Sequence, residues 1–109
     1  MAEDIIIGVD LGGTNVRSAV VDQQGKVTHN ARLSVAGSGS AELVIDRVVE
    51  CVNGTLESCG CENVRGVGVG TPGLIIAEIG TIVYAPNIPG WVDLPLQSIL
   101  EDRFGLPVT

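Results

Sequence analysis

A short segment near the N-terminus carries residue types that bind phosphate. Positions 9–15 read Val-Asp-Leu-Gly-Gly-Thr-Asn. The two adjacent glycines leave backbone N–H groups open to close approach, and turns lined by amide groups suit phosphate oxygens. Asp10 precedes the turn and is a candidate ligand for a hard cation such as Mg²⁺. The candidate phosphate-binding residues are Asp10, Gly12, Gly13, Thr14, Asn15 and Arg17.

The same residues also suit an ordinary β-hairpin turn, because Gly-Gly, Asp and Asn are common in turns. The segment is not a Walker A loop, since no Gly-Lys-Ser/Thr follows, and it lacks the G-x-G-x-x-G pattern of a dinucleotide site. Spacing alone therefore leaves a phosphate site and a plain turn both open.

Apolar periodicity predicts the elements that position this turn. A β-branched run leads into it, and two alternating segments follow it, which indicates an antiparallel meander of strands. Ser40 is a candidate N-cap for a helix with one apolar face. The expected elements are strands at 5–10, 15–22 and 27–35, a helix at 41–58, a strand at 63–70, a hairpin of 74–77 with 81–84, and a helix at 96–104.

This order predicts an α/β fold with a mixed sheet. A helix between two strands is a crossover, so the strand at 63–70 is expected to run parallel to the first strand. Residues 107–109 resemble the start of a further parallel strand, so we expect one domain, 1–109, that is incomplete at its C-terminus. An open sheet edge favours pairing between copies, and we expect a homodimer.

Composition excludes several classes of protein. The chain has 6 basic and 13 acidic residues, a net charge of −7, which is unfavourable for binding nucleic acid. A mean hydropathy of +0.39 argues against disorder. No apolar run approaches the roughly 18 residues of a membrane span, and the N-terminus is acidic where a secretory signal is basic. We therefore expect a cytoplasmic protein with no membrane partner.

Other reactive residue types have simpler interpretations. Cys59 and Cys61 lack further zinc ligands nearby, so loop thiols are favoured over a metal site. His29 has no catalytic partner in the pattern. Trp91 suits either a sugar-flanking role or a packing anchor. The acidic pairs Glu50/Glu57 and Glu101/Asp102 are expected on solvated helix faces.

Three motifs in order resemble the ROK family, which holds bacterial sugar kinases and related repressors within the actin-like ATPase superfamily. The segment at 7–17, Ile-Gly-Val-Asp-Leu-Gly-Gly-Thr-Asn-Val-Arg, resembles its first phosphate motif. Residues 66–73 resemble its glycine-rich strand and G-x-P-G turn, and residues 84–91 resemble its sugar-side loop. The resemblance implies a ribonuclease H-like fold.

The resemblance also implies roles. The turn residues would hold the phosphates of ATP, and Asp10 would hold Mg²⁺. The implied sugar-binding residues are Gly70, Thr71, Pro72, Gly73 and Asn87. The family's catalytic base lies beyond Thr109, as do its zinc motif and adenosine pocket. We therefore expect no catalytic residue in this chain, zinc only in a further C-terminal part, and an isolated chain without kinase activity.

The function implied is the N-terminal part of an ATP-dependent hexose kinase, glucokinase-like, with a small-molecule sugar and a nucleotide as partners. The alternatives are a sugar-responsive repressor of the same family, or a non-catalytic sugar-sensing or assembly domain. Only four residues precede the first expected strand, and the charge is acidic, so the kinase is favoured over a repressor with a preceding DNA-binding domain.

Overall fold

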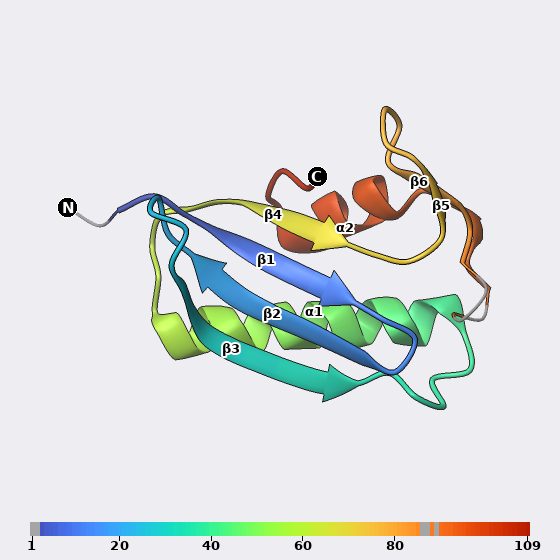
Figure 1. Ribbon diagram of the computed structural model, residues 1–109, viewed down its shortest axis with the longest axis horizontal. Coiled ribbons are helices and arrows are strands. Elements are labelled where there is room, and N and C mark those ends of the chain that lie inside the picture. The colour runs from blue at the N-terminus through green and yellow to red at the C-terminus, as the bar shows by residue number, and fades with distance from the viewer. Residues whose placement is uncertain (1–2, 86–87, 89) are drawn as a thin grey trace.

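The computed structural model describes residues 3–85, 88 and 90–109. Its main sheet has four strands in the order β3-β2-β1-β4, with one long helix against it (Figure 1). The elements are β1 (Ile5–Leu11), β2 (Asn15–Val21), β3 (Val27–Ser34), α1 (Ala41–Cys59) and β4 (Val64–Gly70). The strands and helix predicted for this part of the chain are therefore confirmed.

The pairing directions in the main sheet are also those predicted. β1 pairs antiparallel with β2 and parallel with β4, and β2 pairs antiparallel with β3. Alternate residues of β1, among them Ile7 and Val9, are buried, and their partners on β2 are buried beside them. One face of the sheet thus joins the core, and the other face is not covered by a helix of the described residues.

α1 packs on the buried face of the sheet through a stripe of residues at helical spacing. Val44, Val48 and Val52 are buried along this stripe. The Ser40 side chain accepts a hydrogen bond from the Leu43 N–H at 3.3 Å, which confirms the predicted N-cap. Gly60 ends the helix in the left-handed conformation, with φ of 60°.

A second, smaller sheet of three strands follows β4. It contains β5 (Leu74–Ile76), β6 (Thr81–Tyr84) and β7 (Val92–Leu94), and α2 (Leu96–Phe104) comes after it. The hairpin and α2 were expected, but β7 was not. It has only three residues, too few for an alternating pattern to stand out in the sequence, and Asp93 within it has a positive φ of 49°.

The segment after α2 begins a parallel pairing with β4. Val108 forms a parallel bridge with Val67, in agreement with the strand start expected at 107–109. The Gln97 side chain donates to the Val108 carbonyl at 2.6 Å, and Glu101 accepts from the Val108 N–H at 3.1 Å. The expectation of a merely solvated Glu101 is therefore wrong, because the neighbouring backbone needs an acceptor there.

The prediction for two of the cysteines is also wrong. Cys59 and Cys61 form a disulfide, and the free thiol is the buried Cys51. The left-handed turn at Gly60 accounts for this, since it brings the two Cα atoms to 5.1 Å, a separation that a disulfide spans.

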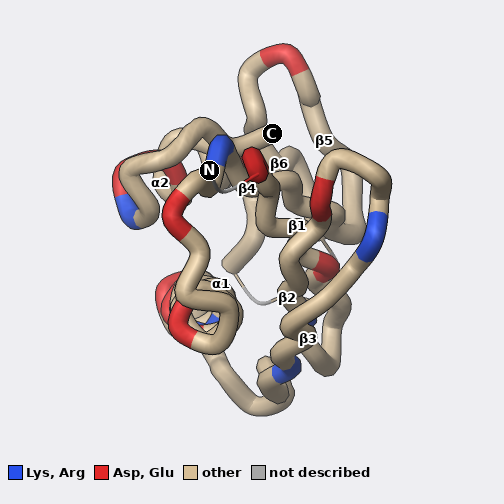
Figure 2. Tube along the Cα trace, turned by 90° about the vertical axis from the view of Figure 1, so that its left-hand side faces the viewer, with Lys and Arg blue, Asp and Glu red and all other residues tan. Residues whose placement is uncertain are grey.

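Charges are spread over the molecule rather than gathered by sign. Figure 2 shows acidic residues on both helices and on loops, with basic residues among them. Neither α1 nor α2, the helices of the described residues, has the length and apolarity needed to cross a membrane.

Candidate functional site

The two glycine-rich motifs meet at one edge of the main sheet. β1 and β4 are adjacent and parallel, so both run to the same edge. Asp10, near the end of β1, stands beside Gly70, the last residue of β4. The turn after β1 and the turn after β4 therefore leave the sheet side by side. The structure thus brings the candidate phosphate residues and the candidate sugar residues at 70–73 to a common edge.

The turn between β1 and β2 is a tight hairpin tied to the end of β3. The Gly12 N–H donates to the Asn15 carbonyl at 2.9 Å, and the Thr14 carbonyl accepts from the Val35 N–H at 2.8 Å. Gly13 and Thr14 are exposed, and in the described part of the chain their N–H groups have no backbone acceptor. This exposed, fixed turn thus has two N–H donors without a backbone acceptor, which is an arrangement that suits an anion.

A cavity of about 280 Å³ adjoins this turn. Gly13 lines one side of it, and the loop at 37–39 lines the other. Its floor includes Val44 from the first turn of α1, together with Ile88. The cavity places the exposed turn beside a second glycine-rich loop, so glycines line it on two sides and Val35, Val44 and Ile88 line the remainder.

Asp10 and Arg17 are opposite each other on β1 and β2, and both are exposed. No group of three or more His, Cys, Asp or Glu that could hold a metal occurs among the residues described. A cation here would therefore have the Asp10 carboxylate as its protein ligand, with phosphate oxygens and water completing the shell. Mg²⁺ is commonly held in this way, so Asp10 fits such a site.

The turn after β4 packs tightly against the second sheet. Gly73 has a φ of 108°, and a Cβ there would collide with the carbonyl of Tyr84 and with Ala85. Thr71 and Pro72 are half-buried, and the Thr71 hydroxyl donates to the Pro72 carbonyl at 3.4 Å. Glycine is thus required at position 73 both by conformation and by space. Asn87, the remaining candidate sugar residue, lies outside the described residues.

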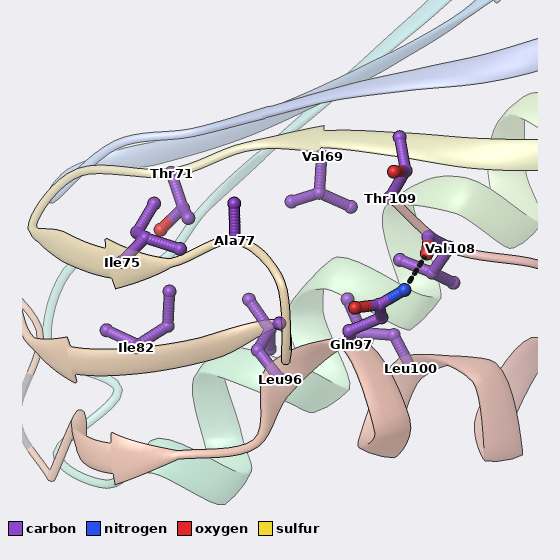
Figure 3. A pocket seen from close by; sticks show the side chains of 11 residues that line it. Val69, Thr71, Ile75, Ala77, Ile82, Leu96, Gln97, Leu100, Val108 and Thr109 are labelled. Carbon is purple, nitrogen blue, oxygen red and sulfur yellow. Dashed lines mark hydrogen bonds between the residues drawn. The ribbon is translucent and has the colours of Figure 1, made fainter.

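A second cavity, of about 220 Å³, lies between the end of β4, the β5–β6 hairpin and α2 (Figure 3). Thr71 is the candidate sugar residue that lines it, and apolar side chains such as Ile75 and Ile82 form most of its wall. The Gln97 side-chain amide, at one side of the cavity, donates a hydrogen bond to the Val108 carbonyl. The cavity thus adjoins the sugar-side turn, while the phosphate turn lies on the cavity described above.

The sequence did not settle the roles of two residues in this region, Trp91 and Arg32. Trp91 is fully buried, which supports the packing interpretation over contact with a sugar. Arg32 was not singled out, yet the register places it directly opposite Arg17 across β2 and β3. The only signal that could have found it is strand register, which apolar alternation does not fix to the residue.

A mixed sheet with a β-β-β-α-β order, and a glycine turn at the end of its first strand, defines an α/β domain of the ribonuclease H-like, actin-like ATPase type. The chain belongs to the ROK family, whose family model matches residues 6–109.

Relatives of named function match nearly the whole chain. It is 36% identical to a glucokinase of Thermotoga maritima, over 94% of this chain and 32% of that protein. A ROK family glucokinase structure from Streptomyces griseus, in complex with glucose and AMPPNP, is 34% identical with a TM-score of 0.85, over 96% of this chain and 32% of that one. A xylose repressor of Caldicellulosiruptor bescii is 31% identical, over 94% of this chain and 26% of that protein. The chain spans about a third of the length of the glucokinases.

Proposed function

We propose that this chain is the N-terminal part of an ATP-dependent sugar kinase, and that it supplies the phosphate-binding turn and one side of the sugar site. The observation that carries the proposal is the pair of free N–H groups at Gly13 and Thr14, held beside the Gly70–Gly73 turn at one sheet edge. Transfer of a phosphoryl group requires donor and acceptor to be held next to each other. Two adjoining turns can meet that requirement.

In this proposal each residue binds rather than reacts. The N–H groups of the turn and the side chains of Thr14 and Asn15 hold phosphate oxygens, and Arg17 offsets their charge. Asp10 would hold Mg²⁺, which supplies neutralisation of charge on the phosphates when it is bound. The acceptor is a hexose bordered by Gly70, Thr71, Pro72, Gly73 and Asn87. No residue here is proposed as the base, so the isolated chain is expected to show no turnover.

A binding measurement tests this proposal on the chain as it stands. The affinity for AMPPNP with Mg²⁺ is measured by calorimetry for the wild type and for Gly12→Ala. A Cβ at Gly12 would lie 3.6 Å from the Asn15 carbonyl, which is ordinary contact, so the hairpin should keep its fold. The added methyl group should obstruct a phosphate and weaken binding by about tenfold.

Gly54→Ala is the matched control, because it makes the same change on α1 where nothing lies within 4 Å of the new Cβ. Its affinity should equal that of the wild type. Equal affinities for Gly12→Ala and Gly54→Ala would show that the nucleotide does not approach the turn. A wild-type chain that turns over ATP and glucose would contradict the absence of a base.

A sugar-responsive repressor is the second candidate. The observation that favours it is the 31% identity to the xylose repressor. A repressor of this family would need sugar binding but no phosphoryl donor. Binding of a hexose without any binding of AMPPNP would therefore favour the repressor. Binding of AMPPNP that depends on Gly12 would favour the kinase.

A further inference from the structure

Two of the five arginines in this chain are opposite each other, and within the described residues neither forms an ion pair with a carboxylate. Arg17 on β2 and Arg32 on β3 are register partners, and both are exposed. The other three form ion pairs: Arg47 with Glu50 at 3.0 Å, Arg65 with Asp4 at 3.1 Å and Arg103 with Asp46 at 3.1 Å. Among the residues that the structure describes, neither Arg17 nor Arg32 forms an ion pair.

This juxtaposition is unfavourable in the free protein. Like charges directly opposite each other in a sheet destabilise it. The chain has 13 acidic residues against 6 basic ones, so carboxylates are abundant, yet none pairs with either guanidinium in the described part. Asp10 stands on the other side of Arg17, one strand further on. An anion bound between the two arginines would turn the repulsion into an attraction.

The next pair on the same face of the sheet, toward the phosphate turn, is also polar. Asn15 on β2 is the register partner of Ser34 on β3. Side chains two residues apart on a strand share a face, so these two lie on the same face as the arginines. The Ser34 hydroxyl accepts from the Ala36 N–H at 3.2 Å, and its own proton remains available. We name these four residues, Asn15, Arg17, Arg32 and Ser34, the β2–β3 platform.

The β2–β3 platform lies on the sheet face away from α1 and begins at the turn. Val16 and Ser18, which alternate with its β2 members, are buried toward α1. Thr14, at the tip of the turn, is tied by its carbonyl to Val35, just after Ser34. The N–H groups of Gly13 and Thr14 therefore lie directly beside Asn15 and Ser34, the two members of the β2–β3 platform nearest the turn.

We infer that the β2–β3 platform binds the phosphate chain that the turn begins to hold, with Arg32 as a second guanidinium beside Arg17. Guanidinium groups bind phosphate oxygens through paired hydrogen bonds, and amide and hydroxyl donors add to them. An extended chain of phosphates can contact the turn at one end and both arginines further along. This inference rests on the proposed function and adds a residue to the same site.

The test uses the chain labelled with ¹⁵N and inorganic tripolyphosphate as the probe. Arg32→Gln removes the charge, Arg32→Lys keeps it, and Arg65→Gln is the matched control at an arginine paired with Asp4. We expect Arg32→Gln to weaken binding by about 5-fold and to make it less dependent on salt, with Arg32→Lys intermediate and Arg65→Gln unchanged. Without the probe, Arg32→Gln should be no less stable than the wild type, because it removes a repulsion.

The NMR resonances of the turn amides and of the arginine side chains show whether this inference fails alone or together with the proposed function. Shifts of the Gly13 and Thr14 amides and of the Arg17 and Arg32 Nε–H groups support both. If the turn amides shift but Arg32→Gln binds as tightly as Arg65→Gln, the inference is overturned and the proposed function stands. If no resonance of the turn or the arginines shifts, both are overturned. Equal shifts of the arginines with sulfate at the same ionic strength would show a non-selective anion site and overturn the inference.

Discussion

The Ser18 hydroxyl on β2 lies 2.6 Å from the Thr55 hydroxyl on α1, inside the interface between sheet and helix. Ser18 also donates to the Cys51 carbonyl at 2.9 Å, so Thr55 supplies the proton of the bond between the two hydroxyls. Both residues are almost fully buried. This short chain of hydrogen bonds fixes how α1 sits on the strand that carries Asn15 and Arg17.

Ser18→Ala should therefore destabilise the protein by roughly 1–3 kcal/mol, because it leaves the Thr55 hydroxyl buried without its acceptor. Thr55→Val should cost less, since Ser18 keeps its bond to the Cys51 carbonyl. Urea unfolding measures both, with the exposed Ser58→Ala on α1 as control. If Ser18→Ala unfolds at the same urea concentration as Ser58→Ala, the buried bond contributes nothing.

Gly54→Ala should stabilise the protein by about 0.5–1 kcal/mol, because alanine is the better helix former and the new Cβ meets nothing within 4 Å. Gly25→Ala makes the same change at a turn with φ of +81°, and it should destabilise although space is open there too. Thermal unfolding of the two variants gives the signs. The same sign for both would mean that backbone conformation does not decide the effect.

Gly73→Ala should destabilise the chain by more than about 2 kcal/mol, since the Cβ would collide with the Tyr84 carbonyl at a positive φ. Gly37→Ala, with φ of +72° and open space around it, carries the strain alone and should cost about 1–2 kcal/mol. Denaturant unfolding of both variants separates collision from strain. A Gly73→Ala protein as stable as Gly37→Ala would show that the turn can move away from β6.

Glu101→Leu should loosen the segment that follows α2, because the Val108 N–H would lose its acceptor. The Val67 N–H donates to the Pro107 carbonyl at 2.9 Å and reports on this segment. Its hydrogen exchange should become about 5-fold faster, as expected for one net hydrogen bond. Glu101→Gln keeps an acceptor oxygen and should exchange like the wild type. Unchanged exchange in Glu101→Leu would mean that the pairing with β4 holds the segment without Glu101.

Local patterns predicted the part of the fold that positions the site. The buried run before Gly12, the cap at Ser40 and the crossover to β4 each depend on residues close in sequence, so their signals were readable. The resemblance to ROK proteins carried the assignment of roles to Asp10 and to the two turns. The roles of individual residues, and the expected homodimer, stay predictions.

Contacts between distant segments were not readable in the same way. The pairing of Arg32 with Arg17 depends on the register of β2 with β3, which shifts between Ser18 and Val20. No pattern of apolar residues reveals such a shift. Glu101 looks like a surface residue on its own helix, and its bond to Val108 exists only because the chain folds back beside β4.

We propose above all that the turn between β1 and β2 binds the phosphates of a nucleotide. Titration of the ¹⁵N-labelled chain with AMPPNP and Mg²⁺, followed residue by residue, tests it most directly. We expect the Gly13 and Thr14 amide resonances to shift with a common affinity, while the Ile79 and Gly80 amide resonances at the tip of the β5–β6 hairpin do not shift. Saturable shifts at the hairpin with none at Gly13 and Thr14 would contradict it.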